Sequence, residues 1–223
     1  MRDGYMYTIL VVDDSLHVAD VFVTMLEQGG YRPLAAHSGQ ECLDILKITT
    51  PDLLLLDVMM KPMDGWTTLE TIKDDPATTD IPVLMLTSNL LTPAQAEQYC
   101  NLIEDYVLKP ITNFELYDTI EHVLRRRQII LSDVERARRC GVDDEVVSEY
   151  ARLAKSIEVN RRFLTILENT CNLNKLSVPV GDNISQALKN LEVHLKSQEA
   201  RHRQIKEEIK KASRESAPKS RFR

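Results

Sequence analysis

The feature that most constrains the fold is a series of short apolar segments that alternate with helix-period segments through the first half of the chain. The segment Leu53–Leu56 is apolar at every position, as expected for a parallel strand buried on both faces. Such alternation favours a parallel sheet with helices on both faces. We therefore predict a five-stranded, doubly wound α/β domain. Its strands are Thr8–Val12, Arg32–His37, Leu53–Asp57, Val83–Thr87 and Tyr106–Leu108.

Start signals for the helices agree with this arrangement. Ser38 and Glu41 have the spacing of a capping box, in which a hydroxyl and a carboxylate satisfy free backbone N–H groups. Thr112 and Glu115 repeat that spacing. The pair Thr92-Pro93 is typical of an N-cap followed by the first helical residue. The pattern thus predicts helices after the second, fourth and fifth strands.

Five polar residues fall where the predicted strands end. The carboxyl ends of the strands in a doubly wound sheet line the crevice in which ligands bind, so these side chains should converge. Each one alone has an ordinary structural explanation; Asp14, for instance, could cap the following helix. Their joint occurrence at the ends of four strands favours a functional site. The residues are Asp13, Asp14, Asp57, Thr87 and Lys109.

Three carboxylates in one crevice repel one another and require a cation. Ligation by a few oxygen donors favours Mg²⁺, which retains water ligands and takes phosphate as a further ligand. We expect Asp13 and Asp14 to hold or orient the ion. Asp57 and the backbone carbonyl of Met59 would complete the protein ligands.

A metal-held carboxylate beside an ammonium group suits phosphoryl transfer, because the transferred group spreads negative charge over its oxygens. In this arrangement Asp57 is the nucleophile that becomes an acyl phosphate. Lys109 pairs with the phosphoryl oxygens, and Thr87 donates its hydroxyl to one of them. We expect no enzymatic activity beyond phosphorylation and dephosphorylation of the chain itself.

Four segments of the first half resemble the receiver domain of response regulators in two-component signalling, and the chemotaxis regulators in particular. They are Val11–Ser15, Leu55–Gly65, Leu86–Ser88 and Tyr106–Pro110. The resemblance covers residues 7 to about 127. It implies a flavodoxin-like fold, Mg²⁺ as cofactor and a sensor histidine kinase as partner in a phosphorelay.

The resemblance also implies details around the site. Lys109 and Pro110 should be joined by a cis peptide bond. Tyr106 should be an aromatic switch that turns inward when Thr87 engages the phosphoryl group. One departure is visible, because the family usually has proline at the position of Lys61, one residue earlier than here. We expect an altered loop there and an intact site.

The second half changes character, because proline and glycine become rare. Apolar residues recur at alternating steps of four and three in two runs, from about Asp143 to Asn172 and from about Asn183 to Ser213. This spacing predicts two helices joined by a turn centred near residues 177–178. We therefore predict a receiver domain at 1–127, a linker with a short helix from Ser132 to Gly141 at 128–141, an antiparallel helical hairpin or coiled coil at 142–215, and a disordered basic tail at 216–223.

The predicted seam between the two helices contains polar residues. Asn160 on the first helix and Gln198 on the second lie at similar distances from the turn. Because a buried amide without a partner costs roughly 1–3 kcal/mol, we predict that Asn160 faces Gln198 or His202, within a chain or across a dimer. The alternative is that the second helix is exposed or frays here. The predicted seam residues are Val146, Tyr150, Leu153, Ile157, Asn160, Leu164, Leu167 and Cys171, facing Ile184, Leu188, Leu191, Leu195, Gln198, His202, Ile205 and Ile209.

Charge is distributed unevenly along the chain. Residues 1–127 carry 9 basic and 20 acidic side chains, whereas residues 196–223 carry 10 and 4. The basic segment could bind a nucleic-acid backbone, which would make the protein a transcriptional regulator. We favour a solvated helix end, because the segment contains no aromatic residue before Phe222. We therefore expect output through a protein partner of the hairpin or a homodimer, and do not expect nucleic acid among the partners.

Other outputs and locations are disfavoured. The second half contains no Walker loop or zinc-ligand spacing, and His194 and His202 lack the surroundings of phosphoacceptor histidines. Four widely spaced cysteines without a CxxC pair indicate reduced thiols. No apolar segment is long enough to span a membrane and the N-terminus has no secretory signal, so we expect a cytoplasmic protein.

Overall fold

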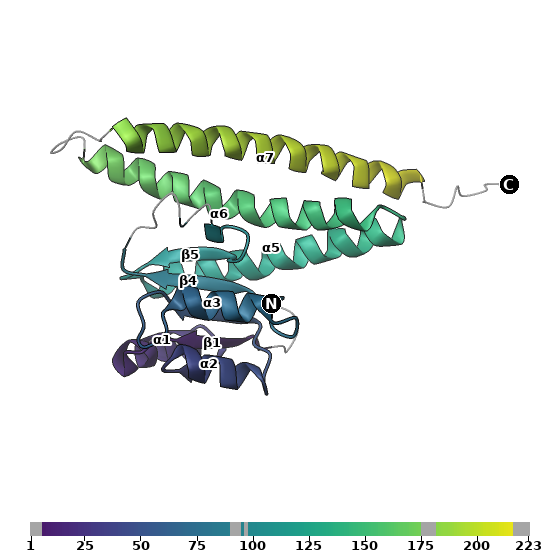
Figure 1. The fold of residues 1–223 in the computed structure, drawn as a ribbon. Helices are drawn as coiled ribbons and strands as arrows, with labels where there is room; N and C mark the ends of the chain where they lie inside the picture. Colours follow the sequence, from purple (N-terminus) through teal and green to yellow (C-terminus); the bar gives the residue numbers. More distant parts are fainter. Residues whose placement is uncertain (1–5, 90–94, 96–97, 175–181, 216–223) are drawn as a thin grey trace. The chain divides into compact units, whose positions relative to one another are not determined.

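The computed structural model describes residues 6–89, 95, 98–174 and 182–215. The chain forms two compact units. The first, here called the sheet unit, comprises residues 1–92 and 102–124. The second, here called the helical unit, comprises residues 93–101 and 125–223. Figure 1 shows the fold of both.

The sheet unit is built on five parallel strands in the order β2-β1-β3-β4-β5. Every strand end lies within one residue of its predicted position. The predicted fold class is therefore confirmed. The strands are β1 (Thr8–Val12), β2 (Arg32–Ala36), β3 (Leu53–Asp57), β4 (Val83–Thr87) and β5 (Asp105–Leu108).

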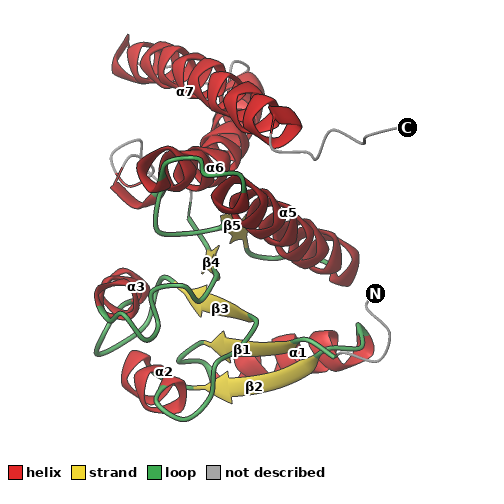
Figure 2. Ribbon diagram, turned by 90° about the vertical axis from the view of Figure 1, so that its right-hand side faces the viewer, coloured by secondary structure: helices red, strands yellow, loops and turns green. Residues whose placement is uncertain are grey.

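Helices cover both faces of this sheet. They are α1 (Leu16–Gln28), α2 (Gly39–Leu46), α3 (Gly65–Asp74) and the first part of α5 (Asn113–Arg139). Figure 2 shows α1 and α5 on one face and α2 and α3 on the other. Strand residues of alternating position, such as Leu53 and Leu55, pack with α1 and α5 in one core cluster. All residues of β3 are buried, which agrees with a central strand covered on both sides.

Of the two predicted capping boxes, the one at Thr112 is complete, whereas at Ser38 the Glu41 carboxylate accepts from the His37 N–H and not from the Ser38 N–H. The Ser38 hydroxyl accepts a hydrogen bond from the Glu41 N–H at 3.1 Å. Thr112 and Glu115 satisfy each other's backbone N–H groups, at 3.0 and 3.3 Å. The third signal, Thr92-Pro93, lies outside the described residues.

The helical unit contains the end of α5 together with α6 (Asp144–Asn174) and α7 (Asp182–Glu215). Figure 1 shows α6 and α7 side by side and running in opposite directions, which confirms the predicted helical character of this half. Ion pairs between them include Arg201–Glu149 at 2.7 Å and Arg161–Glu199 at 2.7 Å. The predicted turn and the predicted disordered tail both lie outside the described residues.

The prediction of a separate short helix in a linker at 128–141 is wrong. One helix, α5, continues through Ser132, because the preceding residues contain no glycine or proline to interrupt its hydrogen bonding. The predicted role of Gly141 at the helix end is confirmed. Gly141 has a φ of +75°, and the Val142 N–H donates to the Ala137 carbonyl at 3.1 Å, which is a Schellman arrangement.

The seam of the hairpin is confirmed at most positions whose side chains the structure describes, whereas Val146, Leu191 and His202 are only half-buried. Buried seam residues are Tyr150, Leu153, Ile157, Asn160 and Leu164 on α6, and Leu195, Gln198, Ile205 and Ile209 on α7. The side chains of Leu167, Cys171, Ile184 and Leu188 lie outside the described set. The spacing of apolar residues therefore predicted which of the described residues lie in the contact between α6 and α7.

A short segment of the helical unit comes from the sequence between β4 and β5. Its residues Tyr99 and Cys100 are buried, and the Ser156 hydroxyl on α6 lies 3.6 Å from the Cys100 thiol. The described residues 98–101 of the connection between β4 and β5 thus belong to the helical unit.

Candidate functional site

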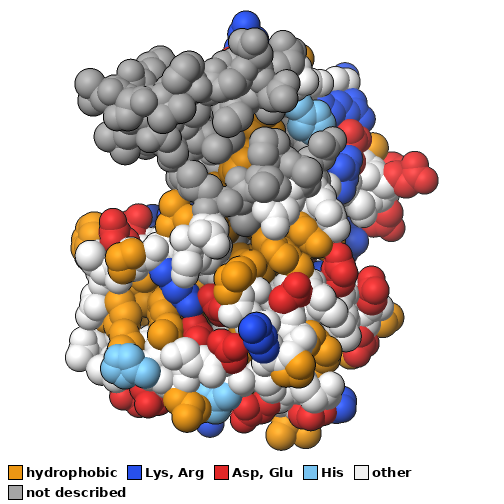
Figure 3. All heavy atoms as spheres, turned by 60° about the vertical axis from the view of Figure 1, so that its left-hand side comes forward, with side chains coloured by type: hydrophobic (Ala, Val, Ile, Leu, Met, Phe, Trp, Pro, Cys, Tyr) orange, Lys and Arg blue, Asp and Glu red, His pale blue; other side chains and the backbone are white. Residues whose placement is uncertain are grey.

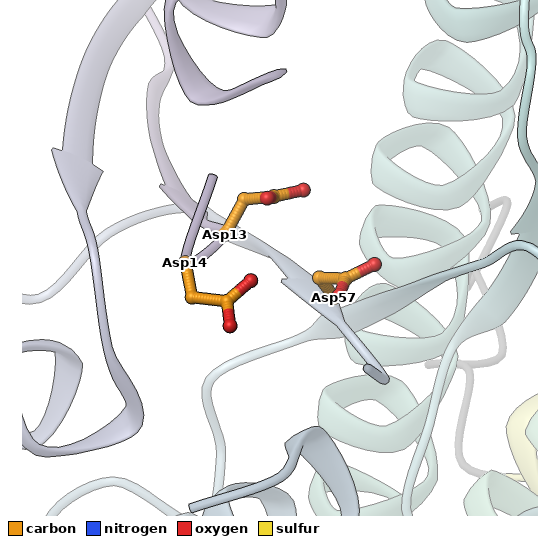
Figure 4. Close-up of side chains that lie close together, drawn as sticks. All are labelled: Asp13, Asp14 and Asp57. Carbon is orange, nitrogen blue, oxygen red and sulfur yellow. The ribbon is translucent and has the colours of Figure 1, made fainter. Parts of the chain in front are cut away.

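The candidate site lies at the carboxyl ends of β1 and β3. Asp13 and Asp14 follow β1, and Asp57 is the last residue of β3 (Figure 4). Ligand oxygens of the three carboxylates lie within 4.8 Å of one another. Asp13 and Asp57 are 2% and 5% exposed, whereas Asp14 is exposed. The structure therefore brings the three predicted acidic residues together.

Lys109 bridges two of these carboxylates. Its Nζ lies 2.6 Å from Asp13 Oδ2 and 2.7 Å from Asp57 Oδ1, and 5.7 Å from the centre of the Phe22 ring. The peptide bond between Lys109 and Pro110 is cis, as predicted. One ammonium group beside three carboxylates leaves two negative charges uncompensated within the cluster.

Backbone N–H groups of the loop after β3 bond one oxygen each of Asp57 and Asp14, whereas Asp13 Oδ1 accepts from the Ser15 N–H. The Met59 N–H donates to Asp57 Oδ2 at 2.9 Å, and the Lys61 N–H donates to Asp14 Oδ2 at 3.0 Å. Asp14 therefore interacts with this loop, and α1 has no side-chain cap, so the alternative of Asp14 as a helix cap is not observed. The altered loop predicted around position 61 contains a second cis peptide bond, Lys61-Pro62.

The start of α3 approaches β3 so closely that only glycine fits at position 65. The Gly65 N–H donates to the Val58 carbonyl at 3.0 Å, and a Cβ at Gly65 would lie 2.1 Å from the Asp57 carbonyl oxygen. The Asp64 carboxylate caps the same helix by accepting from the Thr67 N–H at 2.8 Å. Sequence reasoning included Gly65 only as part of a family segment, and the contact with Asp57 could not be foreseen from it.

Electrostatics at Asp57 reflect competing causes. Burial raises the pKa of Asp57 above the usual aspartate range, while the hydrogen bond and charge of Lys109 oppose that rise, and the charge of Asp13 adds to it. A counter-charge greater than that of Lys109 would thus favour the ionised, nucleophilic form of Asp57.

The two predicted switch residues, Thr87 and Tyr106, are both buried. Thr87, the last residue of β4, is 2% exposed, and its hydroxyl donates to the Asn89 carbonyl at 2.8 Å. In the described residues it forms no hydrogen bond with the three carboxylates. Tyr106 on β5 is fully buried. Their roles as a coupled switch remain predictions.

Charge on the sheet unit agrees with an acidic character. Figure 3 shows acidic side chains spread over the drawn face of this unit. No helix in the described residues combines the length and apolarity needed to cross a bilayer.

Comparisons with known proteins cover both halves of the chain. Residues 9–121, half of its length, match the family described as "Response regulator receiver domain". Residues 126–213 match the family described as "Metanogen output domain 2". A curated relative, "Probable transcriptional regulator ycf27" of Cyanophora paradoxa, is 35% identical over 123 residues, covering 54% of this chain and 49% of the relative. The chain thus matches about half the length of that relative.

Two solved structures are similar to the first half. One is the N-terminal domain of a response regulator receiver protein from Methanoculleus marisnigri, with 67% identity and a TM-score of 0.47, covering 54% of this chain and 98% of that one. The other is the chemotaxis protein CheY4 of Vibrio cholerae, with 25% identity and a TM-score of 0.50, covering 53% and 99%.

These comparisons bear on the expected partners. Several curated relatives are named as transcriptional regulators, so our exclusion of nucleic acid as a partner is not supported. Receiver domains act with histidine kinases and generally bind Mg²⁺ through acidic residues, and this chain has such an acidic cluster. With half of its length matched by the receiver model and the predicted parallel sheet in place, the chain belongs to the response regulator receiver domain family.

Proposed function

We propose that this response regulator accepts a phosphoryl group on Asp57 from a sensor histidine kinase and signals through its helical unit to a protein partner. The observation that carries the proposal is the cluster of Asp13, Asp14 and Asp57 within 4.8 Å, with Lys109 bonded to two of its members. Such a cluster has the surplus negative charge that a divalent cation and a phosphoryl group together require.

The donor set of this cluster fits Mg²⁺. Asp13, Asp14 and Asp57 would hold the ion, with the Met59 carbonyl as a further ligand. When bound, Mg²⁺ neutralises charge on the transferred phosphoryl group. The donors are all oxygens, which suits a hard cation.

The chain's own residues supply the rest of the chemistry. An Asp57 carboxylate oxygen forms the bond to phosphorus as the bond from phosphorus to the donor histidine nitrogen breaks, and the released imidazole takes up a proton. Lys109 moves from the Asp57 oxygen to the phosphoryl oxygens, and Thr87 exchanges its bond to the Asn89 carbonyl for one of them. The chain thus acts as a phosphoacceptor that catalyses its own modification and has no further substrate.

The packing of the segment before β5 supports an output through the helical unit. Thr87 precedes this segment and Tyr106 follows it, while its residue Cys100 contacts Ser156 on α6. In this proposal, a change at Thr87 or Tyr106 reaches the helical unit along the chain through residues 98–101. A protein partner or a second copy of the chain would then bind an altered hairpin.

Labelling tests the acceptor. Acetyl phosphate with Mg²⁺ should add one phosphoryl group per chain, and Asp57→Asn should abolish labelling. Asp52→Asn is the matched control, because Asp52 precedes β3 at its opposite end and accepts a hydrogen bond from the Thr8 N–H. Removal of Mg²⁺ by a chelator should also abolish labelling. Equal labelling of the Asp57→Asn protein would overturn the assignment.

Nucleic-acid binding is the second candidate output, favoured by the names of the curated relatives and by the basic residues of α7. Deleting residues 196–223 would not test it, because Gln198, Ile205 and Ile209 are part of the hairpin core. Replacing the exposed Arg203 and Lys211 with glutamine removes charge without removing core. Retention of the parent chain on duplex DNA, lost in this variant, would favour the second candidate over the first.

A further inference from the structure

A pocket of about 250 Å³ lies in the helical unit. It forms where the end of α5, the start of α6 and the end of α7 lie side by side (Figure 1). Four cationic side chains line it: Arg136 from α5, and Lys206, Lys210 and Arg214 from α7. Neither the receiver chemistry nor the polar layer between α6 and α7 uses these residues.

The cations of this pocket outnumber the acidic groups that pair with them. Arg136 pairs with Asp133 at 3.1 Å, and Lys210 pairs with Glu207 at 2.6 Å. Among the described residues, Lys206 and Arg214 form no ion pair. The pocket therefore has a surplus of two positive charges, held on α7 two turns apart.

The remaining wall is formed by the apolar surfaces of Tyr150 and Ile209 and by the Asp133 carboxylate, which is already paired with Arg136. The Tyr150 hydroxyl donates to Asp133 at 2.7 Å, so the ring lines the pocket while its polar end is already bonded. The His202 ring stacks on the Tyr150 ring at 4.8 Å between centroids. Ile209, 5% exposed, completes the apolar surface. A ligand for this pocket therefore needs an anionic group and a compact apolar body.

We infer that the pocket binds a small organic phosphate monoester. Such a group carries close to two negative charges at neutral pH, which matches the surplus on Lys206 and Arg214. The guanidinium of Arg214 suits phosphate because it donates two parallel hydrogen bonds. The apolar body of the ester would lie against Tyr150 and Ile209.

Size and shape favour a small molecule over a nucleic-acid backbone. Pockets for larger ligands usually enclose about 300–1,000 Å³, so this one fits a compact ligand. A nucleic-acid backbone carries one charge per phosphate along an extended surface and gains its affinity from many separate contacts. The cationic side chains of this pocket instead surround a single small apolar surface, formed by Tyr150 and Ile209.

Titration calorimetry of the full chain with phenyl phosphate tests the inference, with inorganic phosphate and a random duplex DNA as parallel arms. We expect one phenyl phosphate per chain, bound more tightly than inorganic phosphate because of the apolar wall. The double variant Lys206→Gln/Arg214→Gln should weaken phenyl phosphate binding at least about tenfold, since two charge-assisted contacts are lost. Circular dichroism would verify that its helices remain folded.

The matched control is Arg203→Gln/Lys211→Gln, which removes two exposed charges from the same helix outside the pocket. This control should bind phenyl phosphate within about twofold of the parent chain. An equal loss in both double variants would show that net charge, not the pocket, is responsible, and would overturn the inference. Failure of phenyl phosphate to bind at millimolar concentration, or tight DNA binding reduced equally by both variants, would also overturn it.

Discussion

Both units of this protein bury polar side chains, but they satisfy them in opposite ways. In the sheet unit the buried polar groups include the charged Asp13 and Asp57, and Lys109 compensates only part of the charge of these two residues and of the exposed Asp14. In the helical unit they are neutral. There the Asn160 amide donates to Gln198 at 3.2 Å, and the Gln198 amide donates to Ser156 at 3.0 Å.

This difference separates a reactive site from a structural one. A cluster with uncompensated charge at a strand end is unfavourable by itself, and it becomes more stable when a cation or a phosphoryl group binds. The layer of neutral groups carries no net charge, although the buried Asn160 Oδ1 has no hydrogen-bond partner among the described residues, and it fixes which residues of α6 and α7 face each other. The buried polar groups of the sheet unit thus form a reactive site, whereas those of the helical unit align α6 with α7.

Replacing Lys109 by methionine should show the largest stability effect. It would leave Asp13 and Asp57 buried without their cation, so we expect the free energy of unfolding to fall by about 3 kcal/mol in the absence of Mg²⁺. Urea denaturation with and without Mg²⁺ measures this, and Mg²⁺ should recover part of the loss. The comparison variant Arg201→Met removes a more exposed ion pair with Glu149, so it should lower the free energy of unfolding much less than Lys109→Met does. Equal losses would mean that the two units do not differ as described.

Two glycine substitutions sharpen the same comparison. Gly65→Ala forces a Cβ against the Asp57 carbonyl, so we expect a loss of about 2 kcal/mol and a marked drop in phosphoryl labelling. Gly141→Ala places alanine at a positive φ beyond the end of α5 and should cost about 1 kcal/mol. Labelling should be unchanged in this second variant. Thermal unfolding and labelling measured together check both, and reduced labelling in Gly141→Ala would contradict the separation of roles.

The polar layer of the hairpin makes a double-variant prediction. Asn160→Leu alone leaves the Gln198 carbonyl oxygen without its donor, so we expect a loss of about 1 kcal/mol. Replacing both Asn160 and Gln198 by leucine removes the buried amides and should raise the melting temperature above that of the single variant. It should also broaden the distances between α6 and α7, because the layer no longer fixes their alignment. Pulsed electron spin distances between labels on the two helices measure this, and a single sharp distance in the double variant would contradict it.

Much of this molecule could be predicted because its signals are local. The five strands followed from apolar runs, and the ends of α6 and α7 followed from heptad spacing to within a few residues. The pairing of Asn160 with Gln198 was also predictable, because an amide at a seam position needs a partner at the same height.

What escaped prediction depends on contacts between distant residues or on competition between local signals. Ser132 and Asp133 are residue types that favour the start of a helix, yet both lie inside α5, which continues through them. The close approach of Gly65 to Asp57 and the pocket around Tyr150 arise only after the elements have packed. The bonding of Thr87 to Asn89 likewise follows from the turn after β4 and not from any spacing in the sequence.

The smallest expected effect concerns pH and rests on His202, a half-buried histidine of α7. His202 stacks on Tyr150, and burial, together with the charge of Lys206, lowers its pKa, while Asp133 acts in the opposite direction. A histidine with a lowered folded pKa binds its proton more readily in the unfolded chain. Stability is therefore lost as the pH falls through the ordinary histidine value of 6.5 toward the lowered one. Replacing His202 by glutamine should reduce this loss by less than about 1 kcal/mol, measured by urea denaturation at about pH 8 and about pH 5. His194→Gln, an exposed position on the same helix, is the control. If both variants change the pH dependence equally, the packing of His202 on Tyr150 is not its cause.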